Sequence, residues 1–156
     1  MALGLIASTV VWIMSIGGAS FLFRKKISNL IKKIPLPNFL LFLIIGTLYS
    51  VIEENINCPP TGCTLIPFTI PIFFAFLVIY LILLKMLSIK NFYLGILIFG
   101  LMGWAAEFIF GSYRETLWSS PIVTILMSIW TILTYSIIVI LPVTILLENK
   151  KQRSPA

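Results

Sequence analysis

Two glutamates, Glu53 and Glu107, stand near the ends of long apolar stretches of the chain. A carboxylate at membrane depth is costly, and such residues commonly bind ions, carry protons or perform acid–base chemistry. Gly46 precedes Glu53 by seven residues, which puts both on one stripe of a helix. Gly100 and Glu107 repeat this spacing, and Gly103 lies on the same stripe between them. Since glycines let helices approach closely in lipid, both stripes are expected to face protein.

Other polar side chains could share a pocket with these glutamates. Tyr49 lies on the same helix stripe as the first glutamate, and Asn57 lies one turn beyond it. Arg114 follows Glu107 by seven residues and could fold back over its carboxylate. Glu54 is expected to point elsewhere, toward the lipid headgroups.

The last apolar stretch carries a stripe of hydroxyl groups at helical spacing, on Thr124, Ser128, Thr131 and Tyr135. In lipid such a stripe should face the interior of a helix bundle, where it can find polar partners. The sequence therefore predicts a polar pocket that is lined by both glutamates and opens to the outer face of a membrane.

Three interpretations of this pocket stay open on the residues alone. In the first, it is structural: Glu107 and Arg114 pair, and the hydroxyl groups bond carbonyls of their own helix. In the second, the glutamates bind a cation, a proton or a small ligand, as in a binding or transport component. In the third, a buried glutamate acts as general acid in an intramembrane enzyme with a lipid or isoprenoid substrate.

Two cysteines, Cys58 and Cys63, flank the sequence Pro-Pro-Thr-Gly, which favours a tight turn. A turn would bring them within reach of each other, and the loop is predicted to lie on the oxidising side of the membrane. A structural disulfide is the leading interpretation. Free thiols and a redox couple are the alternatives, although the spacing is not Cys-x-x-Cys and the chain has no further cysteine.

The chain contains no histidine. This absence argues against histidine-ligated haem, ordinary catalytic zinc, and Ser-His or Cys-His nucleophile pairs. No glycine-rich phosphate loop is present either. We therefore expect no cofactor and no dedicated metal site; any metal would be a hard cation held by oxygen atoms.

The elements that position these residues must be apolar. The chain is 60% hydrophobic and only 10% charged, whereas soluble domains carry about 25% charged residues. A helix needs about 20 apolar residues to cross a bilayer, and lipid leaves open backbone groups unsatisfied. The apolar runs cover 2–23, 39–52, 67–84, 92–110 and 121–147. They predict a single all-α domain of five transmembrane helices in the cell membrane, with the lipid bilayer as its main partner.

The net charge of +6 would suit a nucleic-acid partner, but the basic residues lie between apolar runs rather than on one soluble face. Nucleic acid is therefore excluded. All basic residues except Arg114 fall after the first run, between the third and fourth, or in the tail at 148–156. By the positive-inside rule these segments are cytoplasmic, so the N-terminus should lie outside and the C-terminus inside.

A shift of 54 residues aligns Gly46 with Gly100 and Glu53 with Glu107. The match suggests a tandem repeat of two helices, which would run parallel because two spans return the chain to its starting side. The repeats would cover residues 37–86 and 91–147.

The first helix stands outside this repeat as an N-out anchor over 2–23. Its small residues, among them Ser15, Gly18 and Ala19, recur at helical spacing and are expected to form the face that docks against the other helices. Because five helices are few for a complete conduction path, we also expect a homo-oligomer or a place in a larger membrane complex.

Overall fold

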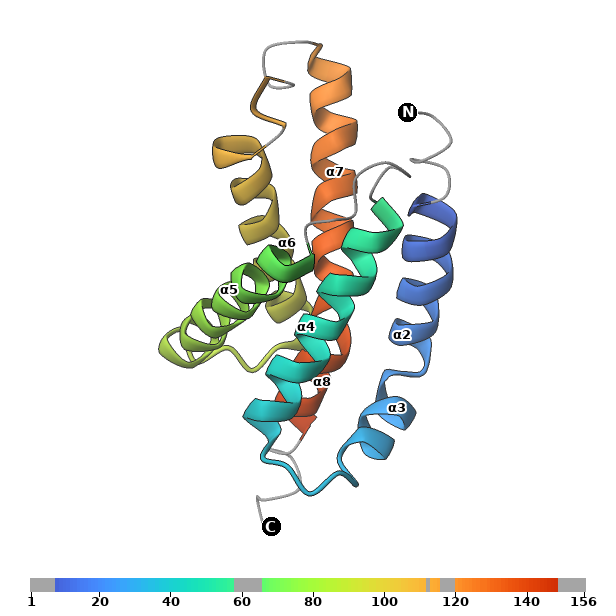
Figure 1. Ribbon diagram of the computed structural model, residues 1–156, viewed down its shortest axis with the longest axis vertical. Helices are drawn as coiled ribbons and strands as arrows, with labels where there is room; N and C mark the ends of the chain where they lie inside the picture. The colour runs from blue at the N-terminus through green and yellow to red at the C-terminus, as the bar shows by residue number, and fades with distance from the viewer. Residues whose placement is uncertain (1–7, 58–65, 112, 116–119, 149–156) are drawn as a thin grey trace.

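The computed structural model describes residues 8–57, 66–111, 113–115 and 120–148, and the long elements in these ranges are helices (Figure 1). The first helix is a π-helical segment, η1 (Ser8–Gly17), which continues into α2 (Gly18–Leu22). It is followed by α3 (Arg24–Ile31), α4 (Asn38–Asn57), α5 (Ile66–Met86) and α6 (Phe92–Ala105), then the π-helical segment η2 (Ala106–Phe110), α7 (Pro121–Ile138) and α8 (Ile140–Glu148). The predicted all-α class is confirmed for these residues.

Three helices are long and apolar enough to cross a membrane: Asn38–Ile56, Phe92–Phe110 and Pro121–Ile138. Two shorter apolar helices, Val10–Leu22 and Ile70–Met86, occupy the places of the first and third predicted spans. The chain thus has the helices of a small multi-pass membrane protein. The total of five crossings stays a prediction.

Local sequence explains where several helices begin and end. The side chain of Asn91 caps α6, since its oxygen accepts hydrogen bonds from the backbone N–H groups of Tyr93 and Leu94. The last predicted span is divided at Val139, where φ is −105° and ψ is 4°. Pro142 accounts for this break, because it has no N–H to donate to Ile138 and its ring would clash with that carbonyl.

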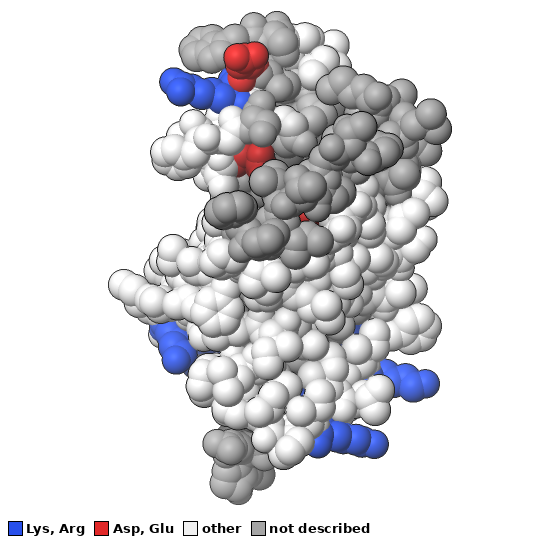
Figure 2. Space-filling view, in the orientation of Figure 1, with Lys and Arg blue, Asp and Glu red and all other residues white. Residues whose placement is uncertain are grey.

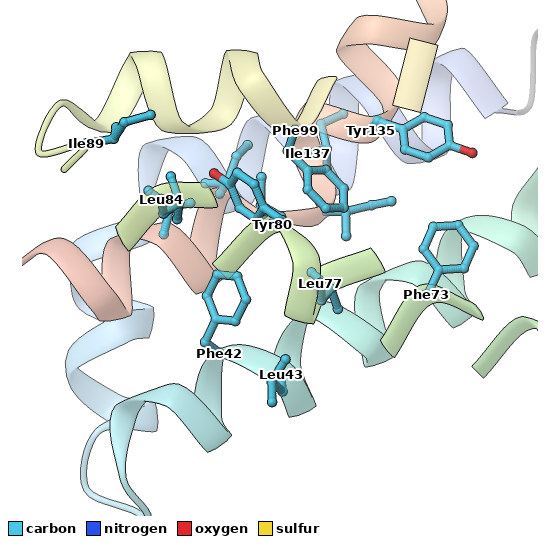
Figure 3. Close-up of a cluster of buried hydrophobic side chains, with 14 of the residues drawn as sticks. Phe42, Leu43, Phe73, Leu77, Tyr80, Leu84, Ile89, Phe99, Tyr135 and Ile137 are labelled. Carbon is cyan, nitrogen blue, oxygen red and sulfur yellow. The ribbon is translucent and has the colours of Figure 1, made fainter. Parts of the chain in front are cut away.

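The core lies around α8, which packs against α3, α4 and α6. Val139, Val143 and Ile145 have no exposed surface. A chain of aromatic rings runs beside them through Phe42, Tyr80, Phe99, Tyr135 and Phe73 (Figure 3). The stacked rings of Phe73 and Tyr135 connect α5 to the end of α7, and Tyr135 also reaches the candidate site.

The first helix docks through a different face from the one that the sequence suggested. Ser15 and Ala19 are exposed, and a Cβ atom added at Gly18 would meet nothing within 4 Å. The docked face instead carries Trp12, which is completely buried and whose Nε1 donates to the Thr134 carbonyl at 3.2 Å. The prediction was wrong because π-helical winding bonds each N–H to the carbonyl five residues back, which changes the periodicity.

The basic stretch after the first helix forms a helix, α3, rather than a loop. Arg24, at its start, lies over the rings of Phe21 and Phe92 at 4.5 and 4.8 Å. Figure 2 shows the visible acidic side chains toward one end of the molecule and most visible basic side chains toward the other. That separation agrees with the pattern behind the positive-inside rule, although the orientation itself stays a prediction.

The repeat also stays a prediction, and the structure offers one similarity and one difference. Gly46 faces Leu77 of α5, and Gly100 faces Ile132 of α7, so each glycine marks a close approach within its helix pair. The two pairs are not alike in direction, however, because α5 runs obliquely whereas α7 follows the long axis (Figure 1).

Candidate functional site

The centre of the candidate site is a hydrogen bond between two helices. The hydroxyl of Tyr135 on α7 donates to Oε1 of Glu107 in η2, at 2.8 Å. This bond depends on close packing of α6 and α7: a Cβ atom at Gly103 would overlap the tyrosine ring, and one at Gly100 would overlap the backbone of Ile132. Both glycines of the predicted stripe therefore face α7, as their spacing with Glu107 indicated.

The backbone around Glu107 is irregular. It lies in the π-helical segment η2, which forms the last turn after α6. The helix ends just beyond, at Gly111, whose added Cβ atom would stand 2.8 Å from Oε2 of the glutamate. One carboxylate oxygen thus accepts from a phenol while the other lies beside a glycine that leaves it room.

A small pocket of about 220 Å³ adjoins this hydrogen bond. Among the residues that the structure describes, Glu107, Tyr135 and Glu54 of α4 form its polar lining. The expectation that Glu54 points elsewhere than the pocket was wrong. Adjacent residues on a helix differ by only about 100°, so a helix with protein on two sides can bury both. Here α4 has α5 on one side and α8 and η1 on others.

The other described residues of the lining are apolar. Ile72, Phe73 and Phe76 of α5 and Ala106 of η2 line it. Phe73 stacks on Tyr135 with ring centroids 6.1 Å apart, so an aromatic surface stands next to the carboxylates. The sequence signal for this wall is the i, i+3 spacing of Phe73 and Phe76, which is hidden because the residues around them are also apolar.

Glu53 is buried, with 5% of its surface exposed, but it is not among the residues that line the pocket. Tyr49, on the same predicted stripe, faces the first helix: its hydroxyl hydrogen-bonds that of Ser20 at 2.7 Å and its ring meets Trp12 edge-on. Asn57 ends α4, and its side chain lies outside what the structure describes. Glu53 and Tyr49 therefore do not line this pocket, and a place for Asn57 in it stays a prediction.

Tyr113 and Arg114 lie just beyond the end of the helix that carries Glu107. Arg114 is exposed, while Tyr113 is half-buried and its N–H donates to the Glu107 carbonyl at 3.1 Å. Burial raises the pKa of Tyr113, and the negative charges of Glu107, Glu53 and Glu54 raise it further. All three carboxylates thus lie within electrostatic reach of one phenol.

The hydroxyl stripe of α7 divides among different partners. Thr131 is buried and donates to the Met127 carbonyl of its own helix at 2.8 Å, the structural alternative that the sequence left open. Ser128 accepts a hydrogen bond from the indole of Trp104 at 2.9 Å. Of the residues on this stripe, Tyr135 is the one that lines the pocket.

The predicted disulfide between Cys58 and Cys63 lies outside the described residues. Within the part of the chain that the structure describes, no group of three or more histidine, cysteine, aspartate or glutamate residues is placed to hold a metal ion. The site is therefore best characterised as two carboxylates and a phenol facing an aromatic wall.

Comparison of the whole chain with protein-family models, with curated proteins and with solved structures finds no match.

Proposed function

We propose that this chain is a small multi-pass membrane protein that binds a cation or a proton at the pocket of Glu54, Glu107 and Tyr135. It would act as a binding or transport component, alone, as a homo-oligomer or as a subunit of a larger membrane complex. The observation that carries the proposal is that two carboxylates from different helices line one small, largely apolar pocket.

Charge balance supports a positive occupant. The Glu107 carboxylate repels that of Glu54, and repulsion between like charges grows as water is excluded. The hydrogen bond from Tyr135 stabilises Glu107 but leaves the net charge of the pocket unchanged. Arg114, the nearest basic residue in sequence, is exposed. A bound cation or proton would relieve the repulsion.

The membrane arrangement belongs to the same proposal. The helix α5 contains 21 residues, or roughly 30 Å of helix, which suits a crossing, and η1 with α2 would supply another. With five crossings and a basic cytoplasmic side, the N-terminus lies outside. The glutamates then lie toward the outer ends of α4 and η2.

A hydrophobic carbodiimide tests the proposal, since such reagents modify protonated carboxyl groups in apolar surroundings. The protein is reconstituted in lipid nanodiscs, and the labelled glutamates are identified by peptide mass spectrometry. We expect modification at Glu54 or Glu107 that decreases when Na⁺, K⁺ or an organic cation is added, or when the pH is raised. The matched control is Glu115, which is exposed and should show no protection by cations.

Labelling of Glu54 and Glu107 that responds neither to cations nor to pH would contradict the proposal. So would protection that is equal at Glu115, since it would show a general effect of salt on the reagent.

A further inference from the structure

The walls of the pocket differ sharply in character. Carboxylates of Glu54 and Glu107 stand on one side, while Ile72 and the rings of Phe73 and Phe76 form the other. The ring of Phe76 is fixed by an edge-on contact with Phe99, at 5.4 Å between centroids. An occupant that satisfies both walls needs a positive charge and an apolar body.

A hard metal ion suits this lining poorly. Ca²⁺ takes six to eight oxygen ligands, and Mg²⁺ needs near-octahedral coordination. The described lining offers two carboxylates and one phenol, and the O–H of that phenol already donates a hydrogen bond to Glu107. An organic ammonium group makes no such demand. It needs negative charge nearby and is attracted to the faces of aromatic rings.

The position of the pocket favours entry from the apolar side. Ile72, on its rim, is 65% exposed, so the pocket reaches the outer surface of α5. In the proposed membrane arrangement that surface faces lipid. A molecule that partitions into the bilayer with its charge near the headgroups could therefore enter sideways, past α5.

We infer that the pocket recognises organic monocations of the substituted-ammonium class that carry an aromatic or alkyl body. The cationic group lies between Glu54 and Glu107, and the body lies against Phe76 and Ile72. This inference rests on the proposed function and goes beyond it by naming the class of ligand.

Three probes of matched shape separate charge from apolar contact. Benzyltrimethylammonium carries both features, tetramethylammonium has the charge alone, and neopentylbenzene is the neutral isostere of the first. Each is titrated against carbodiimide labelling of Glu107 in nanodiscs. We expect benzyltrimethylammonium to protect at a concentration about tenfold lower than tetramethylammonium, the size expected for contact of its ring with Phe76. Neopentylbenzene should give no protection.

A pair of variants on one helix tests the aromatic wall. Phe76→Leu should remove most of the preference for benzyltrimethylammonium. Phe74→Leu, two residues away on α5 and 45% exposed, is not part of the lining and should preserve it. Thermal unfolding of both variants, followed by tryptophan fluorescence, checks that each remains folded. If both variants preferred benzyltrimethylammonium over tetramethylammonium to the same degree, the apolar body of the ligand would not lie against Phe76.

The outcomes also separate this inference from the proposed function. If Na⁺ or tetramethylammonium protects as well as benzyltrimethylammonium, the ligand class is wrong while cation binding stands. Protection by neopentylbenzene would show recognition without charge and overturn the inference. If no cation protects but the labelling still depends on pH, the site is a proton site and the inference falls alone. If neither cations nor pH has an effect, the proposed function fails with it.

Discussion

Glu107 and Tyr135 are 28 residues apart in the chain and meet through a hydrogen bond of 2.8 Å between η2 and α7. The contact places a carboxylate and a phenol at one pocket with Glu54. It also joins the candidate site to the core, because the tyrosine ring stacks on Phe73 and contacts Phe99.

Replacement of Tyr135 by phenylalanine removes this hydrogen bond and keeps the stacked ring. A hydrogen bond to a charged group contributes roughly 1.5–3 kcal/mol, so Tyr135→Phe should lower the free energy of unfolding by about that amount. Chemical denaturation in detergent measures it. Tyr93→Phe serves as control, since Tyr93 is 59% exposed. An unchanged stability for Tyr135→Phe would argue that the bond to Glu107 does not form.

The close approach of α6 and α7 at Gly103 gives a second test. An alanine there would overlap the Tyr135 ring, so Gly103→Ala should cost about 1–3 kcal/mol of stability and displace the phenol from Glu107. Gly18→Ala is the matched control, because its Cβ atom meets nothing and alanine favours a helix by about 1 kcal/mol over glycine. The unfolding temperature should therefore fall in Gly103→Ala and rise in Gly18→Ala. Two stabilising substitutions would contradict the packing of α6 on α7.

The docked face of the first helix is tested at Trp12, which is fully buried and hydrogen-bonded to α7. Trp12→Ala should cost about 3–5 kcal/mol. Met14→Ala, at a position that is 68% exposed, should change stability by less than about 0.5 kcal/mol. If the two variants were equally stable, the first helix would not dock through Trp12.

The half-buried phenol of Tyr113 should make the stability of the protein depend on pH in the alkaline range. Burial, and then the charges of Glu107, Glu53 and Glu54, raise the pKa of its phenol above the usual value of 10. In the unfolded chain the phenol ionises near pH 10, so its contribution to stability is complete below that pH. The contribution is lost as the pH rises through the folded pKa. Tyr113→Phe cannot ionise, so its unfolding temperature should fall less steeply above pH 10 than that of the wild type. Parallel curves would place Tyr113 away from the carboxylates.

How far the sequence predicts this site depends on the kind of information each residue carries. Glu107 and Tyr135 were both identified because a polar side chain in an apolar helix must find a partner, and helical periodicity indicates on which side. The role of Gly100 and Gly103 followed from the same argument. These are properties of a single helix, so the sequence of that helix is enough to predict them.

The errors came from relations between helices. Periodicity separated Glu54 from Glu53 but could not show that α4 has protein on two sides, so that Glu54 also turns inward. The oblique course of α5, which brings Phe73 and Phe76 to the glutamates, likewise has no local signal. In the first helix, π-helical winding moved the docked face to Trp12, because the assumed period was that of an α-helix.

If Glu54 and Glu107 share one pocket that takes up a positive charge, their two charges should be coupled. A double-variant cycle on unfolding temperature tests this coupling, with Glu54→Gln, Glu107→Gln and the double variant at alkaline pH and low salt. Removing either charge relieves the repulsion, so each single variant should be more stable than the wild type. The double variant should gain less than the sum, with a coupling of roughly 0.5–3 kcal/mol. Glu115→Gln, at an exposed position, is the control.

The same variants are then unfolded with benzyltrimethylammonium present. We expect this cation to stabilise the wild type and Glu115→Gln at alkaline pH, and we expect no response from the double variant. Additive effects of the two substitutions, together with equal responses of all variants to the cation, would contradict a shared pocket. If Glu107→Gln instead destabilises the protein at every pH, Glu107 is a structural hydrogen-bond partner and not a binding group.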